Sequence, residues 1–284
     1  MSRPAVVTTV AELRAHLKPW RQAGERIALV PTMGALHAGH ISLVRIGHAR
    51  AERVVTSIFV NPKQFAPTED LATYPRDFDG DLAKLAEAGV DLVFAPEAGE
   101  MYPDGEATVV TVGGPSAGLE SDARPHFFAG VATVVTKLLI QCAPDVAIFG
   151  EKDFQQLAVI RTLTRDLALP TEIVAGATMR EPDGLAMSSR NLYLGKEDRR
   201  RATALSAALA AAGEAIEDGA PVDAALVSAR RAIEAAGFTI DYVELRDAET
   251  LAASTRPGKP RRLLAAARIG GVRLIDNIAV VAVE

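Results

Sequence analysis

The sequence of 284 residues predicts an α/β fold, with a Rossmann-like parallel sheet that carries helices on both faces and a smaller C-terminal α+β domain. Two observations predict this organisation. Short apolar runs alternate with segments of helical periodicity, which is typical of βαβ units and a parallel sheet. Beyond about residue 178 the pattern changes, because alanine-rich helical stretches replace the alternation. We therefore expect a sheet domain over residues 1–178 and a lid domain over residues 179–284.

Apolar runs and helical periodicity define the elements of the first domain. Runs of strand length lie at 27–30, 54–60, 92–94, 109–112, 146–149 and 172–174. Helical spacing is found over 9–23, 39–51, 78–88, 130–142 and 153–167. Ligands of such sheets bind beyond the carboxyl ends of the strands. The polar segments 31–40, 61–65 and 150–153 each follow a run, so we expect them to meet at one edge of the sheet.

The second domain is predicted to combine two helices with a few strands. Its helical stretches cover 197–217 and 222–236, and its apolar runs lie at 240–245, 263–267 and 278–283. A basic segment at 255–262 is interpreted as a solvated turn. The order of these elements does not specify a topology, so the prediction is limited to the α+β class.

Composition limits the classes of function. The formal net charge is −5, which argues against nucleic acid as the main partner because binding to phosphate backbones needs excess Lys and Arg. Cys142, the single cysteine, lies in an apolar run and is expected to be a buried, inert thiol. No uncharged apolar run reaches the length of a membrane span, and no signal-peptide core is found, so a cytoplasmic location is expected.

The segment 31–40 is the most informative part of the chain. It joins a predicted strand to a predicted helix, where free backbone N–H groups and the helix dipole favour phosphate. His37 and His40 are three residues apart and share one side of the helix start, while Gly34 and Gly39 permit close approach of a ligand. The alternative is a pair of surface histidines or a helix cap. Metal binding is poorly supported, because no cysteine or further histidine completes a ligand set.

A second polar group follows the predicted sheet. Residues 181–184 have the composition of a turn, and 187–190 read Met-Ser-Ser-Arg. Two hydroxyls and a guanidinium can hold phosphate oxygens while charge develops in a displacement at phosphorus. The alternative is a serine helix cap beside a surface arginine. Together with the histidine pair, this order resembles the two nucleotide-binding signatures of class I aminoacyl-tRNA synthetases and nucleotidylyltransferases.

The resemblance narrows to one family when further blocks are included. The chain resembles the pantothenate synthetase (pantoate–β-alanine ligase) family at segments 31–40, 58–65, 74–76, 149–156, 180–191, 241–242 and 274–277. This resemblance implies a two-step reaction. A pantoate carboxylate attacks the α-phosphorus of ATP to give pantoyl adenylate and pyrophosphate, and the amine of β-alanine then displaces AMP. It also implies Mg²⁺ as a cofactor, a homodimer, and no nucleic-acid or membrane partner.

The resemblance also implies roles for individual residues. His40 is expected to donate to the phosphate being displaced, supported by His37, and the other catalytic candidates are Lys152, Ser188, Ser189 and Arg190. The expected ATP contacts are Met33, Gly34, Ala35, Leu36, His37, Ala38, Gly39, His40, Gly150, Glu151, Lys152, Asp153, Met179, Met187, Ser188, Ser189 and Arg190. Gln64, Gln156 and Arg124 are the candidates for binding pantoate, and Asp81 is the candidate near the metal.

Each of these roles has an ordinary structural alternative. Gln64 follows Pro62 and has the setting of a turn residue. Lys152 and the aspartate after it would otherwise be an exposed charged pair. Arg124 would otherwise be a surface residue. Asp81 follows Gly80 where the family often has an acidic pair, so an acid in the first turn of a helix is its alternative.

A further departure from the family pattern lies at 124–131. The family usually has His directly before Phe-x-Gly-Val, but Phe127 occupies that place and His126 comes one residue earlier. Either the loop shifts to restore the imidazole, or the contact is absent.

Three rival functions are considered. A nucleotidylyltransferase would stop after nucleotide transfer and would lack the block at 59–65. An RNA-binding or synthetase fragment would show a basic face. A non-catalytic nucleotide-binding module would not need Gln64 and Gln156 in addition to both phosphate motifs.

Overall fold

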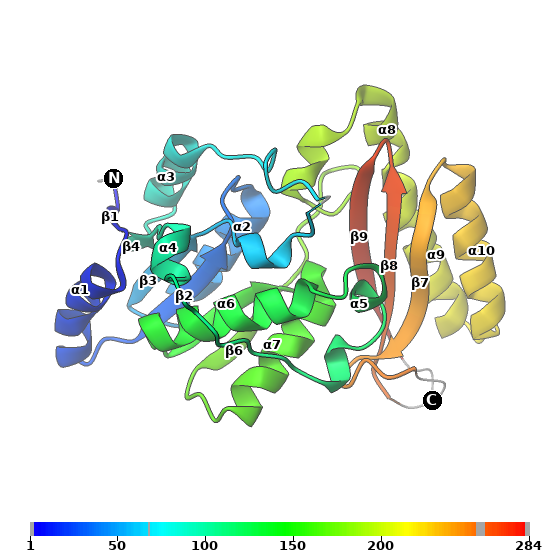
Figure 1. Cartoon of the computed structure of the whole chain (residues 1–284). Coiled ribbons are helices and arrows are strands. Elements are labelled where there is room, and N and C mark those ends of the chain that lie inside the picture. The colour runs from blue at the N-terminus through cyan, green and yellow to red at the C-terminus, as the bar shows by residue number, and fades with distance from the viewer. Residues whose placement is uncertain (1–2, 68, 254–258, 282–284) are drawn as a thin grey trace.

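The computed structural model describes residues 3–67, 69–253 and 259–281. Within these residues the structure has a six-stranded parallel sheet and a three-stranded antiparallel sheet. The smaller sheet is formed by the C-terminal part of the chain (Figure 1). No helix of this described part is long and apolar enough to cross a membrane.

The larger sheet has the strand order β1-β4-β3-β2-β5-β6, with every neighbouring pair parallel. Its side chains are buried on both faces, as the fully buried run 27–30 illustrates. The Rossmann-like prediction is therefore confirmed. The strands are β1 (Ala5–Val7), β2 (Ile27–Thr32), β3 (Arg53–Ile58), β4 (Leu92–Phe94), β5 (Val146–Gly150) and β6 (Glu172–Gly176).

Helices cover both faces of the larger sheet. The first, sixth and seventh helices pack on one face against side chains such as Leu29 and Val55. The second and third pack on the other face against Val30 and Val54, as the alternation of side chains along a strand requires. These helices are α1 (Val10–Gln22), α2 (Ala38–His48), α3 (Phe78–Glu87), α6 (Phe127–Cys142) and α7 (Phe154–Asp166), with the short α4 (Ala98–Met101) and α5 (Glu120–Ala123) between them.

The strand order reverses between β2 and β5. From β2 the chain proceeds to β3 and β4 on one side, whereas β5 and β6 extend the sheet on the other side. At such a switch point the loops that follow the two central strands diverge and leave a crevice. The segments after β2 and β5 are 33–37 and 151–153, so the predicted meeting of polar loops is confirmed at this place.

The smaller sheet lies between its own helices and the first domain. Side chains such as Leu263 and Ala265 face α9 and α10, and Leu264 faces Phe154 and Leu119 of the first domain. The two domains therefore pack directly against each other. The elements are α8 (Lys196–Arg201), α9 (Thr203–Glu217), α10 (Val222–Ala235), β7 (Thr239–Asp247), β8 (Arg261–Ile269) and β9 (Val272–Val280), with antiparallel order β7-β8-β9.

Several predicted elements differ from the structure. The run 109–112 is wrong as a strand, because it pairs with no strand of the described residues. The edge strand β1 was not predicted. The helix predicted at 197–217 is divided at Ala202, and the last strand begins at Val272 rather than 278. Residues 254–258 of the basic segment lie outside the described residues, and its last two arginines belong to β8.

Candidate active site

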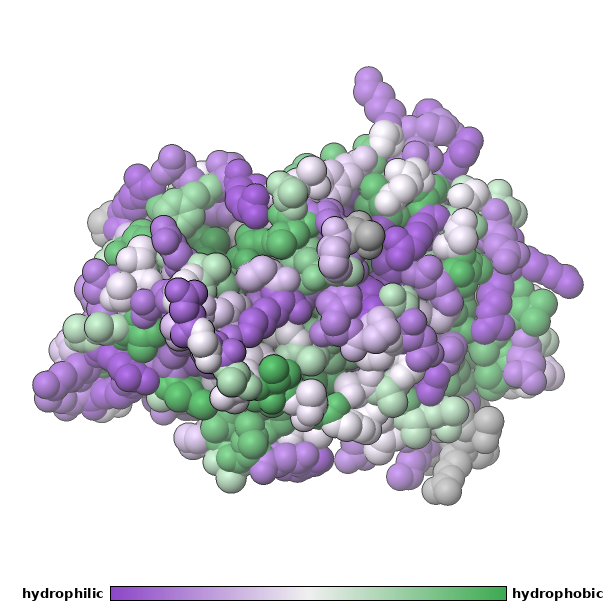
Figure 2. Space-filling view, viewed as in Figure 1, coloured by the Kyte–Doolittle hydropathy of each residue, from purple (hydrophilic) through white to green (hydrophobic). Residues whose placement is uncertain are grey.

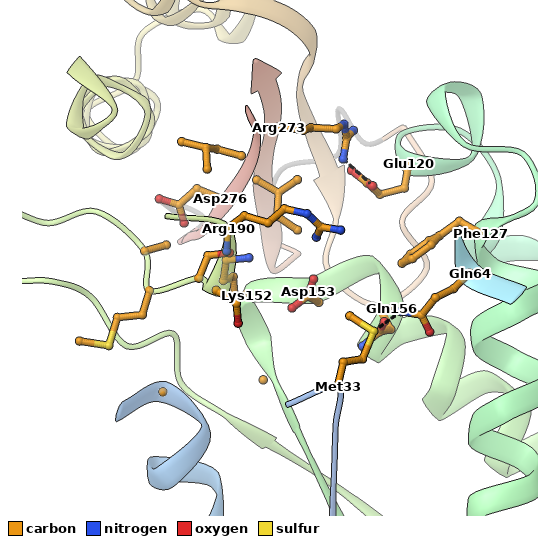
Figure 3. Close-up of a pocket in the computed structure, with 18 of the residues that line it drawn as sticks. Met33, Gln64, Glu120, Phe127, Lys152, Asp153, Gln156, Arg190, Arg273 and Asp276 are labelled. Atoms are coloured by element: carbon orange, nitrogen blue, oxygen red, sulfur yellow. Dashed lines mark hydrogen bonds and ion pairs between the residues drawn. The ribbon is translucent and has the colours of Figure 1, made fainter. Parts of the chain in front are cut away.

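A cavity of about 790 Å³ lies between the carboxyl edge of the larger sheet and the C-terminal domain (Figure 3). Its walls come from the turn after β2, the loop after β3, the N-terminal part of α6, the turn after β5, and β9. Most of the residues predicted to form the site line it: Met33, His37, Gly39, His40, Gln64, Arg124, Gly150, Lys152, Asp153, Gln156, Met179, Met187, Ser188, Ser189 and Arg190. Gly34, Ala35, Leu36, Ala38, Glu151 and Asp81 do not.

Asp81 anchors the turn between β2 and α2. Its Oδ2 accepts the N–H of Ala35 at 2.8 Å and its Oδ1 accepts the N–H of Leu36 at 2.7 Å. The turn needs this support because Gly34 and Ala35 both have positive φ, which is strained for alanine. Asp81 is 1% exposed and lies outside the lining of the cavity, so its position matches the alternative of an acid in the first turn of α3.

The backbone sets the tautomers of the two histidines. The Nδ1 of His37 accepts the N–H of Gly39 at 3.2 Å, and the Nδ1 of His40 accepts the N–H of His37 at 3.2 Å. In each neutral ring the proton therefore resides on Nε2. The helix-cap alternative is also true, since these bonds cap α2. The ring centroids lie 4.1 Å apart at the N-terminus of the helix.

Burial keeps both rings neutral. Desolvation lowers the pKa of His37 to about 4, with the nearby Lys152 ammonium adding to the effect. Desolvation likewise lowers the pKa of His40 to about 3, with His37 as the next cause. At neutral pH each imidazole is thus a donor through Nε2 that carries no charge.

Stability is expected to fall below neutral pH because of this burial. A histidine of the unfolded chain has a pKa of about 6.5. Below this pH the unfolded state therefore binds a proton that His40 does not bind in the folded state. Between pH 7 and pH 5 this group alone lowers the free energy of unfolding by about 2 kcal/mol. Urea denaturation of the wild type and His40→Gln at both pH values measures it. The difference in the free energy of unfolding between the two proteins should change by about 2 kcal/mol from pH 7 to pH 5. The same pH dependence in both proteins would contradict the prediction.

The loop after β3 presents Gln64 to the cavity. Asn61, 1% exposed, donates through Nδ2 to Gln64 Oε1 at 3.1 Å and to the carbonyl of Gly130 at 3.2 Å. Tyr102 donates its hydroxyl to Asn61 Oδ1 at 2.7 Å. Because its carbonyl oxygen is occupied, Gln64 directs its NH₂ group towards Met33 Sδ, 3.0 Å away. The turn-residue alternative is also met, since Gln64 ends the 3₁₀ turn η1 (Pro62–Gln64).

Adjacent glutamines on α7 differ in position. Gln155 is buried and receives the N–H of Glu120 at 3.0 Å, while its amide donates to the carbonyls of Pro115 and Gly118. Gln156 lines the cavity and points to the same space as Gln64 (Figure 3). Gln155 fixes the start of the helix and leaves Gln156 available to a ligand.

The C-terminal domain fixes the turn after β5. Asn277 on β9 donates its amide to the carbonyls of Glu151 at 3.0 Å and Lys152 at 2.8 Å. Arg262 donates to Asn277 Oδ1 at 2.6 Å and so fixes its orientation. The Lys152 backbone is therefore held while its side chain lines the cavity, as Figure 3 shows. Within the described residues, no ion pair joins Lys152 to Asp153, so the alternative of a charged pair is not met.

The Met-Ser-Ser-Arg segment contacts the first motif directly. Ser189 donates its hydroxyl to the carbonyl of Ala35 at 3.0 Å. Ser188 accepts the N–H of Arg190 at 3.3 Å and caps the 3₁₀ helix η4 (Ser189–Tyr193), as the cap alternative predicts. Arg190 reaches over the cavity and forms a two-pronged ion pair with Asp70 at 3.1 Å. The two sequence motifs thus form one site.

The comparisons with known proteins identify the family. The sequence matches the family described as pantoate-beta-alanine ligase over residues 5–279. The chain belongs to this family. It is 54% identical to the pantothenate synthetase of Caulobacter vibrioides, over 99% of this chain and 100% of the relative. It is 57% identical to that of Mesorhizobium japonicum, over 99% of each chain.

Solved structures of the ligase family have the same fold. The Thermus thermophilus pantothenate synthetase superposes with a TM-score of 0.90 at 47% identity, over 96% of this chain and 98% of the other. A Francisella tularensis ligase, solved with a β-γ ATP compound and β-alanine, gives a TM-score of 0.83 at 32% identity, over 97% of each chain. Members of the family ligate pantoate and β-alanine with ATP.

The departure from the family pattern at Phe127 is retained in the structure. The phenyl ring lines the cavity, 5.0 Å from the ring of Phe128 and 4.0 Å beneath the guanidinium of Arg124. His126 does not line the cavity, and its buried Nε2 has no hydrogen-bond partner within the described residues. The loop therefore does not restore the imidazole.

Arg124 lines the cavity but is already paired. It forms two bonds with Glu69, at 2.6 and 2.7 Å, and donates to the carbonyl of Gln64 at 2.9 Å. Its charge is largely neutralised, so it is less available to pantoate than the sequence suggested. Asn61, Glu69, Asp70 and Asn277 were not among the predicted site residues. Each of the four is a polar residue that holds a predicted site residue in place, so its role can be recognised only from the structure.

Proposed function

We propose that this cavity carries out both half-reactions of pantoate–β-alanine ligation, with ATP along the turn after β2 and pantoate between the two glutamines. The observation that carries the proposal is the position of two neutral Nε2–H donors at the start of α2, in the same cavity as Gln64 and Gln156. Phosphate and a hydroxy acid thus find suitable donors side by side.

In the first half-reaction, a carboxylate oxygen of pantoate attacks the α-phosphorus of ATP. The new O–P bond forms as the bond to the β-phosphate oxygen breaks, and pyrophosphate leaves with the electron pair. His40 donates to a phosphate oxygen on which charge develops, with Lys152 and Arg190 adding positive charge. A neutral imidazole serves here because it donates a hydrogen bond without needing a proton from solution.

In the second half-reaction, the amine of β-alanine attacks the acyl carbon. The new C–N bond forms, the C–O bond to AMP breaks, and the nitrogen loses a proton. The residues of the cavity act by position, since Gln64 and Gln156 keep the acyl group beside the phosphate site. The C-terminal domain covers the cavity through β9 and limits access of water to the adenylate.

Magnesium accompanies ATP in this proposal as a phosphate-bound ion. The described residues contain no group of three or more His, Cys, Asp and Glu side chains that fits a metal, and Asp81 is committed to two backbone N–H groups. These residues do not form a protein site for the ion, and both oxygens of Asp81 are occupied, so no step is assigned to a protein-bound metal.

We also propose a cytoplasmic homodimer. The support is the segment 109–112, which has the sequence of a strand but pairs with none in the described chain. Its Val109 is 60% exposed, and Val110 donates to the hydroxyl of Thr133 on α6. Figure 2 shows hydrophobic residues over α6 on this face. Light scattering should give twice the chain mass of 30.0 kDa, and the mass of a single chain would reject the dimer.

Replacing Gln156 by leucine tests the pantoate site. Loss of a hydrogen bond to a charged ligand costs about 1.5–3 kcal/mol, so KM for pantoate should rise about 10- to 100-fold. The dissociation constant of ATP should stay within about twofold, because Gln156 is assigned to pantoate and not to the phosphates. Steady-state kinetics and equilibrium binding measure both values. An unchanged KM for pantoate would remove this residue from the site.

A further inference from the structure

Two neighbouring carboxylates line the cavity. The segment 69–74, here named the strap, follows the loop that carries Gln64, and Glu69, Asp70, Thr73 and Tyr74 of the strap all line the cavity. Each of its two carboxylates holds a different arginine. Glu69 pairs with Arg124 and Asp70 pairs with Arg190.

The two ion pairs attach the strap to different parts of the molecule. Arg124 precedes α6 in the first domain and also donates to the carbonyl of Gln64, so its pair with Glu69 stays on the side of the glutamines. Arg190 belongs to η4, beyond β6, and its pair with Asp70 spans the cavity. The hydroxyl of Tyr193 adds a bond to the carbonyl of Thr73 at 2.8 Å.

Arg190 is engaged through one edge of its guanidinium. Its Nε and Nη2 each contact one oxygen of Asp70 at 3.1 Å, which is the fork geometry that also binds phosphate. One guanidinium edge cannot hold a carboxylate and a phosphate in this geometry at the same time. Asp70 would also repel a triphosphate placed beside it, since both are anionic.

We propose that Asp70 is a counterion that holds Arg190 until a phosphate group of ATP replaces it. This inference rests on the proposed function, because it takes the triphosphate to lie beside Arg190. In the empty enzyme Asp70 orients the guanidinium and fastens the strap across the cavity. When ATP binds, Arg190 exchanges the carboxylate for phosphate, and Asp70 is released from Arg190 while Glu69 stays on Arg124.

The exchange makes the free energy of ATP binding less favourable, and this effect can be measured. Breaking the Asp70 pair opposes nucleotide binding, so the variant that lacks the charge should bind ATP more tightly. The pair is partly exposed, with 30% and 26% of the two side chains accessible, and such pairs contribute little more than about 1 kcal/mol. We expect Asp70→Asn to lower the dissociation constant of ATP about three- to tenfold.

Glu69→Gln is the matched control, because it removes the neighbouring charge by the same chemical change. Its arginine lies on the side of the glutamines, so the dissociation constant of ATP should change less than about twofold. Equilibrium titration of the full chain with a non-hydrolysable ATP analogue gives these values, and thermal unfolding verifies that each variant is folded. In an Arg190→Ala background, Asp70→Asn should have a smaller effect on ATP binding, because only the repulsion between Asp70 and the triphosphate is then removed.

The outcomes separate this inference from the proposed function. Wild-type protein that does not bind the analogue would contradict both. Wild-type binding with weaker or unchanged binding by Asp70→Asn would overturn the inference alone. An equal effect of Asp70→Asn with and without Arg190 would also overturn it, since the carboxylate would then act through general repulsion.

Discussion

Replacing His40 by alanine is expected to slow formation of the acyl adenylate about 10²-fold or more, the scale of removing one transition-state donor. The Nδ1 of this ring is occupied by the N–H of His37, so only Nε2–H can serve the phosphates. Because the pKa of His40 is lowered to about 3, the residue stays neutral throughout the neutral range. The single-turnover rate should therefore show no titration of this group between pH 6 and 8.

His48→Ala is the control for this experiment. His48 lies on the same helix, but it is exposed and contacts the carbonyl of Ala88 rather than the cavity. Its replacement should leave the rate of adenylate formation unchanged. A single-turnover rate for His40→Ala within a few-fold of the wild type would refute the role of His40 as a donor.

Gly130→Ala should damage both the stability of the fold and the use of pantoate. A Cβ at Gly130 would lie 2.2 Å from the carbonyl oxygen of Lys63 and 2.9 Å from the backbone nitrogen of Gln64. Backbone atoms cannot rotate away, so α6 and the turn that carries Gln64 must separate. Overpacking of this kind costs about 1–3 kcal/mol. We expect kcat/KM for pantoate to fall at least about tenfold as Gln64 moves.

Gly99→Ala is its matched control. Gly99 lies in the short helix α4, it has no positive φ, and nothing lies within 4 Å of the position of its Cβ. Alanine should leave stability unchanged or raise it by up to about 1 kcal/mol through helix propensity. Denaturant unfolding and steady-state kinetics of both variants make the comparison. If Gly130→Ala had the stability and the kcat/KM of the wild type, the close packing against Gln64 would not matter for function.

Sequence periodicity predicted the sheet because its central strands are buried on both faces. Runs such as 27–30 and 146–149 carry continuous apolar residues between helices, and this pattern has few alternatives. The strand predicted at 109–112 failed for a physical reason. Its residues are β-branched, as is typical of a strand, but a strand also needs a partner for its backbone, which the local sequence does not specify.

The candidate site was predicted as a set of residues but without their mutual contacts. The turn 31–40 could be recognised because glycine and histidine at a strand–helix junction have a specific chemistry. The contacts of Ser189 with Ala35 and of Asn277 with the turn after β5 join segments far apart in the chain. They depend on how the second domain packs on the first, and no local pattern encodes that. The contacts of Asp81 could not be predicted for the same reason, since its backbone partners are 45 and 46 residues away.

The rival functions predict different intermediates. A nucleotidylyltransferase on this fold would complete its reaction after nucleotide transfer and would not respond to β-alanine. A non-catalytic module would bind ATP without releasing pyrophosphate. The membership of the chain in the ligase family, together with Gln64 and Gln156 in the same cavity as the histidines, favours the two-step ligase.

Pyrophosphate release before the addition of β-alanine tests the central claim most directly. Purified protein is mixed with ATP, Mg²⁺ and pantoate, and pyrophosphate, AMP and pantothenate are followed together. The account predicts a burst of pyrophosphate equal to the number of active sites, and steady release of AMP and pantothenate once β-alanine is added. Folded protein that binds ATP but shows neither the burst nor the later products would contradict it.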